Sequence, residues 1–261
     1  MGVVNVTPDS FSGDGFSNEP EKAVQYALKL IEDGADILDI GGESTRPGAQ
    51  AVSAEEELER ILPVVEEIRR NTQIPISVDT YKAPVASAVI NAGADIVNDV
   101  SSLRFDPDIC QVVSKSRAGL ILMHMRGTPK NMQKIPSSLE IIIEIRNEFK
   151  RAVSQAKIGG VASDRIIVDP GIGFGKTVKN NLKILNQLSQ FQELGFPVLI
   201  GTSRKSFIGE ILGTGVSDRV FGTAASVAVS VVGGAHIVRV HDVREMRQVV
   251  DVIDSIRCEM H

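Results

Sequence analysis

Short apolar runs alternate with amphipathic, helix-like stretches from one end of this sequence to the other. That alternation is typical of parallel strands joined by crossover helices, and eight strand and helix pairs close a barrel. A length of 261 residues is usual for such a barrel folded as one unit. The sequence therefore predicts an α/β fold, a (β/α)8 TIM barrel that forms a single domain over residues 1–261. The predicted strands are Gly2 to Val6, Asp36 to Ile40, Pro75 to Asp79, Asp95 to Val100, Gly119 to His124, Arg165 to Asp169, Pro197 to Gly201 and His236 to Val240.

The stretch that begins at Ser53 carries the clearest helix signal. Ser53 is followed three residues later by Glu56, which is the spacing of a capping box. Apolar residues then recur at three- and four-residue steps and form one stripe, which is expected to pack on the outside of the barrel. We therefore predict a helix that begins at Ser53 and buries this stripe. The stripe consists of Leu58, Ile61, Leu62, Val65 and Ile68.

Composition excludes several classes of protein. Lys and Arg number 28 against 33 Asp and Glu, so the formal net charge is -5 and no broad basic face for nucleic acid is expected. Cys110 and Cys258 are too few for a disulfide framework and lack metal-ligand spacing. No apolar run is long enough to span a membrane, and the first residues lack the pattern of a signal peptide. The sequence predicts a cytoplasmic protein without nucleic-acid or membrane partners.

The stretch from Arg165 to Lys176 ends an apolar run on Asp169 and then places a glycine at every second position. Glycine carries no side chain and accepts positive φ, so the backbone can turn sharply beside a ligand. Two phosphate motifs are excluded, because Pro170 stands where the Walker pattern needs glycine and the third glycine comes too early for the dinucleotide fingerprint. Asp169 is therefore predicted to lie at the mouth of a pocket. The alternative is a tight turn whose aspartate caps the next helix.

Polar residues stand at the carboxyl ends of the predicted strands, where barrels of this kind hold their active sites. Several of them interrupt apolar runs, and burying them without partners would cost on the order of several kcal/mol. A polar ligand would supply the missing partners. The residues are Asn5, Asp39, Glu43, Ser44, Thr45, Arg46, Asp79, Asn98, Asp99, His124, Arg126, Asp169, Ser203, Lys205, Arg239 and His241.

This set divides into acceptors and donors, and one ligand should need both. A fused amino-heterocycle would donate its ring N–H and amino protons to the acceptors, which are Asp79, Asn98 and Asp169. A phosphate would accept from groups after the last two strands, where barrels commonly hold phosphate. Those groups are Lys205, Arg239 and His241, and Asn5 could reach the phosphate or its metal ion. For Asn5 and Arg239, a structural hydrogen bond is the alternative.

Two polar loops, Thr7 to Asn18 and Ser44 to Ala51, contain glycines and have the size of lids. Loops of this kind commonly close over a bound substrate and exclude water. The alternative is a pair of solvated connections.

Seven motifs, taken together and in order, resemble the dihydropteroate synthase family, and the resemblance covers almost the whole chain. The motifs are Asn5 to Phe11 (NVTPDSF), Gly42 to Gly48 (GESTRPG), Val78 to Thr80 (VDT), Asn98-Asp99, Asp169 to Lys176 (DPGIGFGK), Ser203 to Lys205 (SRK) and Arg239 to Asp242 (RVHD). The resemblance implies a transferase of folate biosynthesis that joins 6-hydroxymethyl-7,8-dihydropterin diphosphate to p-aminobenzoate and releases diphosphate. It also implies Mg²⁺ as cofactor, a homodimer, and inhibition by sulfonamides, which mimic p-aminobenzoate.

The resemblance assigns roles motif by motif. It implies that the pterin is held by Asp79, Asn98, Asp169 and Lys205. It implies that diphosphate is held by Asn5, Arg239 and His241, with Asn5 also reaching the metal ion. It implies that p-aminobenzoate is bordered by Phe11, Thr45, Arg46, Pro47, Phe174 and Ser206. The expected catalytic residues are Asp79, Asp169, Lys205 and Arg239.

The groups available favour a reaction led by departure of the diphosphate, because no cysteine and no Ser-His pair stands ready to form a covalent intermediate. Cations would stabilise the leaving group, and the buried acids would stabilise positive charge on the pterin. Two rival functions share the pterin pocket. One is a pterin-binding methyltransferase barrel that serves a corrinoid protein, which has no use for the second lid or a diphosphate site, and the other is a pterin-binding subunit without catalysis.

Two departures from the family pattern bear on these expectations. Family members carry residues before the motif that begins at Met1, so the chain is expected to be a trimmed domain or part of a longer fusion. The first loop reads FSGDG from Phe11, where the family commonly has Ser-Asp-Gly-Gly. The presence of this lid therefore follows from the resemblance more directly than its geometry does.

Overall fold

The strands of this protein run parallel, as their apolar, β-branched sequences predict. The computed structural model describes residues 1–7, 16, 19–46 and 48–259. All eight predicted strands are confirmed within these residues. The strands are β1 (Gly2–Asn5), β2 (Leu38–Gly41), β3 (Ile76–Asp79), β4 (Ile96–Asp99), β5 (Gly119–Met123), β6 (Ile166–Asp169), β7 (Leu199–Ile200) and β8 (Ile237–Val238).

The strands close into a barrel. Strands β1 to β6 pair in sequence order in one sheet, and β7 pairs with β8 in a second. Single parallel bridges join the two sheets, one between Val168 and Val198 and the other between Gly2 and Val240. The predicted (β/α)8 TIM barrel is thereby confirmed. Strands β7 and β8 are only two residues long, which is shorter than predicted, because their outer residues pair through bridges rather than a continuous ladder.

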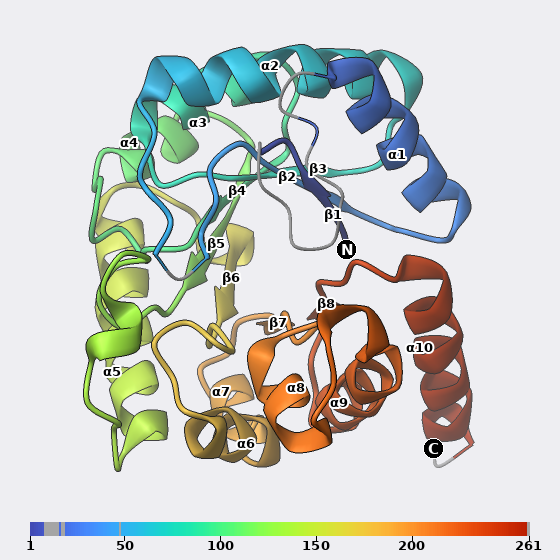
Figure 1. The fold of residues 1–261 in the computed structure, drawn as a ribbon. Coiled ribbons are helices and arrows are strands. Elements are labelled where there is room, and N and C mark those ends of the chain that lie inside the picture. The colour runs from blue at the N-terminus through green and yellow to red at the C-terminus, as the bar shows by residue number, and fades with distance from the viewer. Residues whose placement is uncertain (8–15, 17–18, 47, 260–261) are drawn as a thin grey trace.

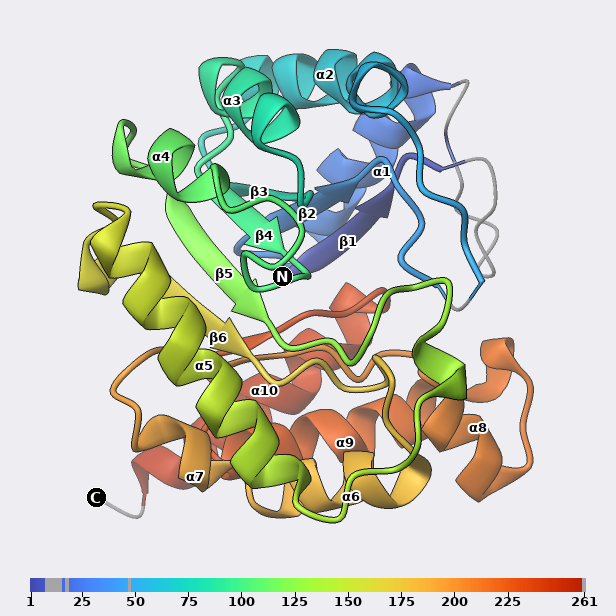
Figure 2. The same cartoon turned by 90° about the vertical axis from the view of Figure 1, so that its left-hand side faces the viewer.

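Helices surround the strands (Figure 1), with α1, α2 and α3 on one side and α6, α8 and α9 on the opposite side in both views (Figures 1 and 2). The α-helices are α1 (Pro20–Glu32), α2 (Ala54–Asn71), α3 (Ala83–Asn91), α4 (Ile109–Ser114), α5 (Ile141–Ile158), α6 (Val178–Asn186), α7 (Ser189–Gln192), α8 (Ser206–Leu212), α9 (Val220–Val232) and α10 (Val243–Cys258). Short 3-10 turns are η1 (Met132–Lys134), η2 (Ser163–Arg165) and η3 (Val216–Asp218). Helix α8 is additional to the barrel ring, since it precedes α9 within the unit that follows β7.

Helix α2 begins where the sequence predicts. The Ser53 hydroxyl accepts a hydrogen bond from the Glu56 amide at 3.1 Å, which satisfies one of the free N–H groups of the first turn. The predicted apolar stripe is confirmed in part, because two of its members, Leu58 and Leu62, are only partly buried. The buried face instead consists of Glu57, Ile61, Val64, Val65 and Ile68. A buried glutamate in this face is unexpected, and its partner lies beside the candidate site.

Apolar side chains fill the space between the strands and the helices and also the barrel itself. Inside the barrel, Met1, Ile121 and Leu199 pack together far from one another in sequence. None of the helices in the described part of the chain is long and apolar enough to cross a membrane.

Candidate active site

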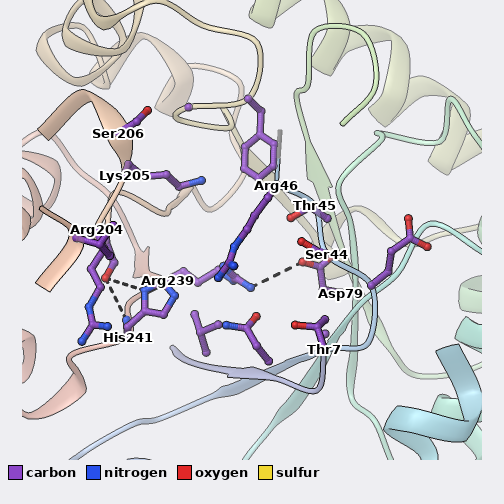
Figure 3. Close-up of a pocket in the computed structure, with 18 of the residues that line it drawn as sticks. Thr7, Ser44, Thr45, Arg46, Asp79, Arg204, Lys205, Ser206, Arg239 and His241 are labelled. Carbon is purple, nitrogen blue, oxygen red and sulfur yellow. Dashed lines mark hydrogen bonds and ion pairs between the residues drawn. The ribbon is translucent and has the colours of Figure 1, made fainter. Parts of the chain in front are cut away.

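A cavity of about 490 Å³ opens at the carboxyl ends of the strands. The loops that follow β2 and β5 gather at this end together with α8, on the right-hand side of Figure 2. Figure 3 shows Lys205 and Ser206 on one side of the cavity, Ser44 and Thr45 on the other, and Arg239 directed across it toward Asp79. The described residues that line the cavity are Val3, Asn5, Thr7, Gly41, Glu43, Ser44, Thr45, Arg46, Asp79, Met132, Gly173, Phe174, Ser203, Arg204, Lys205, Ser206, Val216, Arg219, Arg239 and His241.

Acidic and amide groups from neighbouring strands meet at the floor of the cavity. Asp39 on β2 is fully buried, and its Oδ2 atom accepts from Arg239 Nε at 2.6 Å and from Asn98 Nδ2 at 3.3 Å. A second nitrogen of Arg239 lies 3.7 Å from Asp79 Oδ2. Burial, and then the charge of Asp39, raise the pKa of Asp79 well above its usual range. One guanidinium therefore contacts Asp39 and lies near Asp79, and its single positive charge can balance only one of these two carboxylates.

Two acceptor atoms in this cluster have no hydrogen-bond partner among the described residues. They are Asp39 Oδ1 and Asn98 Oδ1, and both are buried. A buried acceptor without a donor is costly, so such atoms mark places where a ligand donates. Among the described residues, Asp39, Asn98 and Asp169 are not part of the cavity lining, and Asn98 donates to Asp39.

Asp169 ends β6 and belongs to the glycine turn that follows. It is 5% exposed, and burial raises its pKa to about 6. Its Oδ1 atom accepts from the Gly171 amide at 2.7 Å. The next helix, α6, is capped by Thr177, whose side chain accepts from the Asn180 amide. The alternative of an aspartate that caps this helix is therefore wrong.

Close packing of the turn explains its glycines. Gly171 has φ 65°, and a Cβ atom there would lie 2.0 Å from the carbonyl oxygen of His124. The Lys176 ammonium is buried and donates to the carbonyls of His124, Gly171 and Phe174 at 3.1, 2.8 and 3.1 Å. It fixes the turn, and with it Phe174, against the end of β5.

Lys205 stands immediately before α8 and faces the cavity. Its Nζ atom lies 4.0 Å from the centroid of the Phe174 ring, which is a cation–π contact. Burial, and then the nearby charge of Arg239, lower the pKa of Lys205 to about 8. The preceding residue, Arg204, has φ 56°, and its guanidinium pairs with Asp242 at 3.0 and 2.5 Å. This pair fixes the loop after β7 to the loop after β8.

His241 enters the cavity from the loop after β8. Its amide donates to Ser203 Oγ at 3.1 Å, and its Nδ1 atom lies 3.0 Å from the same oxygen. The expectation that no serine is paired with a histidine is therefore wrong for Ser203 and His241. Burial, and then the positive charge of Arg239, lower the pKa of His241 to about 3. The ring is therefore neutral near pH 7. It offers hydrogen bonds and no charge, so it fits the expected group of donors without adding to its positive charge.

Most of the other predicted site residues line the same cavity, and two lie outside the described residues. Asn5, Thr45, Arg46, Phe174 and Ser206 all line the cavity. Phe11 and Pro47 lie outside the described residues.

Sequence reasoning missed Arg219, a charged residue of the cavity, and gave no role to Asp39 and Glu43. Arg219 lines the cavity, and its guanidinium donates to the carbonyls of Arg204 and Thr214 at 2.9 and 3.3 Å. No motif marks it, because α8 and a turn bring it back to the site. Asp39 and Glu43 were recognised as polar residues after β2, but nothing in the sequence showed which groups they meet.

This chain is similar to known proteins over almost its whole length. The profile described as "Pterin binding enzyme" matches residues 1–241. Dihydropteroate synthase of Synechocystis sp. is 48% identical over 257 residues, covering 98% of this chain and 89% of that protein. The crystal structure of Yersinia pestis dihydropteroate synthase with a sulfonamide drug complex has a TM-score of 0.95 at 40% identity and covers 99% of this chain and 94% of its own. Xanthomonas albilineans dihydropteroate synthase with 4-aminobenzoic acid has a TM-score of 0.91 at 42% identity and covers 98% of this chain and 92% of its own.

Proposed function

This chain belongs to the dihydropteroate synthase family of pterin-binding enzymes, and from that premise we propose how its cavity divides the work of the reaction. The chain is a transferase of folate biosynthesis, which condenses 6-hydroxymethyl-7,8-dihydropterin diphosphate with p-aminobenzoate to give 7,8-dihydropteroate and diphosphate. The proposal rests on one observation: buried hydrogen-bond acceptors gather at the floor of the cavity, and hydrogen-bond donors gather at its rim.

The pterin lies at the floor of the cavity, against Asp79, Asn98, Asp169 and Lys205. The unpartnered Asn98 Oδ1 atom supports this placement, since the pterin amino and ring N–H groups are the donors that it lacks. Asp39 joins this set for the same reason. The raised pKa values of Asp79 and Asp169 reflect their burial, and a donating ligand favours the ionised form of each.

Diphosphate lies between the strand ends and the loops after β7 and β8, near Asn5, Arg239 and His241. Arg239 supplies charge, while neutral His241 supplies a ring N–H. If the Ser203 hydroxyl donates to Nδ1, the ring proton is on Nε2, where it can donate to a phosphate oxygen.

We propose Mg²⁺ as cofactor, held by the diphosphate and by the Asn5 side chain. The described residues contain no group of three or more His, Cys, Asp or Glu side chains that could hold a metal ion. The Asn5 side-chain oxygen and the oxygens of diphosphate are ligands that fit Mg²⁺, which commonly keeps waters and binds through substrate phosphates with few protein ligands. When bound, Mg²⁺ neutralises charge that develops on the departing diphosphate.

The rim of the cavity takes p-aminobenzoate, between Ser206 on one side and Thr45 on the other (Figure 3), and Phe174 and Arg46 also line the cavity. Phe174 offers an aromatic face, and Arg46 offers a cation for the carboxylate. The resemblance adds Phe11 and Pro47 to this rim.

Departure of the diphosphate leads the reaction. Arg239 and Lys205 stabilise the leaving group, and Asp79 and Asp169 stabilise positive charge that spreads from the exocyclic carbon into the pterin ring. The neutral amine of p-aminobenzoate then attacks the exocyclic carbon, so that a C–N bond replaces the C–O bond to diphosphate, and the proton that the nitrogen loses passes to the released diphosphate. Asp79, Asp169, Lys205 and Arg239 are the proposed catalytic residues.

One assay tests the function. The protein is incubated with the pterin diphosphate, p-aminobenzoate and Mg²⁺, and both dihydropteroate and free diphosphate are measured over time. Equal amounts of the two products are expected, with loss of both on chelation and recovery on adding Mg²⁺. Binding of the pterin without either product would instead favour a pterin-binding subunit. Methyl transfer from methyltetrahydrofolate would favour the corrinoid methyltransferase.

We also propose a homodimer formed through α9 and α10. These helices pack against each other, and exposed apolar side chains line both: Phe221, Val229, Val232, Val252 and Ile256. Apolar surface of this kind marks an interaction site. Sedimentation equilibrium should show a dimer, and Val232→Glu on α9 should shift it toward monomer.

We also propose a cytoplasmic location, which the free thiols of Cys110 and Cys258 support.

A further inference from the structure

A buried charge cluster lies behind the rim of the cavity, where no role has been assigned. Lys82 Nζ donates to Glu43 Oε2 and to Glu57 Oε2, each at 2.5 Å. The Tyr81 hydroxyl donates to the other oxygen of Glu43 at 2.6 Å. The side chains of Glu43 and Glu57 are 6% and 1% exposed, and that of Lys82 is 15% exposed. The cluster joins the unit that follows β2 to the unit that follows β3.

Glu43 also holds the two ends of the loop Ser44 to Ala51 together. It is the residue before the loop, and its Oε2 atom accepts from the amide of Val52, the residue after the loop, at 3.3 Å. On the same side, Arg60 donates to the carbonyl of Gly42 at 2.8 Å. The base of the loop is therefore fixed to α2 and to the β3 unit.

The far part of the loop has a separate contact. The amide of Gly48 donates to the carbonyl of Pro129, in the loop after β5, at 3.0 Å. Thr45 and Arg46, which line the cavity, lie between this contact and the anchored base. Their positions depend on how firmly the base is held.

Packing alone does not explain the cluster. It buries two carboxylates with one ammonium, and Glu57 Oε1 has no hydrogen-bond partner among the described residues. Burial also raises the pKa of Glu57. Apolar side chains of similar volume commonly stabilise a fold as well as or better than buried ion pairs. An arrangement this costly is expected to fix a geometry.

We propose that Glu43, Tyr81 and Lys82 form a clasp that fixes the two ends of the loop, next to Ser44 and Ala51, and so keeps Thr45 and Arg46 in the positions that accept p-aminobenzoate. The three are positioning residues, because they act through Thr45 and Arg46. This inference rests on the proposed function. Loss of the clasp leaves the direct contacts of the pterin floor in place, since Asp79, Asn98 and Asp169 are held by other groups. Tyr81→Phe also leaves the charges of Glu43 and Glu57 near Asp79 unchanged.

The test compares Glu43→Gln and Lys82→Met with a matched control, Arg69→Met. Arg69 also ties α2 to a neighbouring unit, through Gly93 O at 3.0 Å and Asp95 at 2.5 Å, but at the opposite end of the helix. If the loop is competent in about one molecule in ten without its clasp, the apparent KM for p-aminobenzoate rises about tenfold. The KM for the pterin diphosphate should stay within about twofold. The control should change neither KM.

Two milder variants keep the test decisive if the first two fold poorly. Tyr81→Phe removes only the hydroxyl and keeps the edge-on contact with Phe105, and it should raise the KM for p-aminobenzoate about threefold. Glu57 accepts from Lys82 through one oxygen only and does not bond to the loop, so Glu57→Gln should leave that KM within twofold. Glu43 accepts through both oxygens, and Glu43→Gln cannot keep both. Equal changes in both KM values, or a p-aminobenzoate KM unchanged in Tyr81→Phe, would overturn the clasp.

A second readout does not depend on catalysis. Amide hydrogen exchange over residues 44–52 should become faster in Glu43→Gln and remain unchanged in Arg69→Met. Exchange that stays as slow as in the wild type would contradict the clasp. A wild-type protein that forms no dihydropteroate would contradict the proposed function, and the exchange measurement would still decide the inference.

Discussion

Replacing Asp169 by asparagine separates what this acid does for the reaction from what it does for the fold. Its Oδ1 atom accepts from the Gly171 amide at 2.7 Å, and an asparagine oxygen can accept the same bond. The turn after β6 should therefore survive in Asp169→Asn. The variant loses the negative charge and one of the acceptors offered to the pterin.

The expected loss of activity follows from those two changes. A hydrogen bond to a charged group contributes about 1.5 to 3 kcal/mol, which corresponds to about 10- to 150-fold in rate. The loss should appear in kcat as well as in kcat/KM, because the charge is needed most when the diphosphate departs.

The expected effect on stability has the opposite sign. The pKa of Asp169 is raised to about 6 by burial, against about 3.9 in an unfolded chain. The folded state therefore holds the proton more tightly, and the stability that this provides is lost as the pH rises from about 4 through 6. The difference of about two pKa units corresponds to roughly 3 kcal/mol at pH 7. Asp169→Asn avoids this cost, so its free energy of unfolding should exceed that of the wild type by up to about 3 kcal/mol at pH 7, and by less than about 1 kcal/mol near pH 4.

Urea unfolding from pH 4 to 7.5, together with the product assay, measures both effects. The exposed acid Asp164, at the start of the same unit, provides the control: Asp164→Asn should change neither activity nor stability. A variant at position 169 with near-normal activity would remove this residue from the site. A variant that is less stable than the wild type at pH 7 would show that the ionised carboxylate stabilises the fold, contrary to the reasoning above.

Three further predictions concern the turn, the rim and the order of binding. Gly171→Ala should unfold the protein or lower its stability by more than about 3 kcal/mol in urea titrations, because of positive φ and a Cβ atom 2.0 Å from His124 O. Gly48→Ala, whose Cβ would meet nothing within 4 Å, should cost only about 1 kcal/mol, and equal costs would refute the clash. Substituting Phe11 or Pro47 should raise the inhibition constant of a sulfonamide more than the KM for p-aminobenzoate, and parallel changes would argue against their place at the rim. Calorimetry should detect p-aminobenzoate binding only when a pterin and Mg-diphosphate are present, and similar affinity for the enzyme alone would contradict the assignment of the two loops as lids.

Most of the fold could be predicted from local signals in the sequence. Each strand was recognised from a short apolar run, and the start of α2 from the Ser53 and Glu56 pair, because these depend on neighbours within a few residues. The two short strands, β7 and β8, were overestimated, since the length of a ladder depends on its partner strand. The ring of polar strand ends was also readable, because a barrel brings all carboxyl ends to one face.

Contacts between distant parts of the chain could not be read in the same way. Arg219 reaches the cavity only through the path of α8, and no periodicity marks it. Glu57 fits the buried face of α2, where a polar residue would ordinarily be assigned to solvent. Its burial depends on Lys82, 25 positions later, and the partner cannot be identified without the register of β2 against β3. The charge state of His241 likewise depends on its burial and on Arg239 rather than on its motif.

Arg239 links the acids of the cavity floor to the proposed diphosphate site, so we expect the two halves of the pterin substrate to be recognised together. Arg239 bonds to Asp39 at 2.6 Å and approaches Asp79 at 3.7 Å, so it stands between the acids of the floor and the rim where diphosphate is proposed to lie. A pterin that donates hydrogen bonds to these acids stabilises their negative charge, which Arg239 otherwise stabilises alone. The guanidinium can then turn its remaining N–H groups toward phosphate, at a smaller electrostatic cost than before the pterin donates to the acids. A pterin without diphosphate would compete with Arg239 for Asp39 and Asp79 and would bring no anion to replace them. Diphosphate alone would have to compete with Asp39 for the same cation. The coupling lies in one side chain, so it depends on the fixed distance between the strand that carries Asp39 and the strand end that carries Arg239.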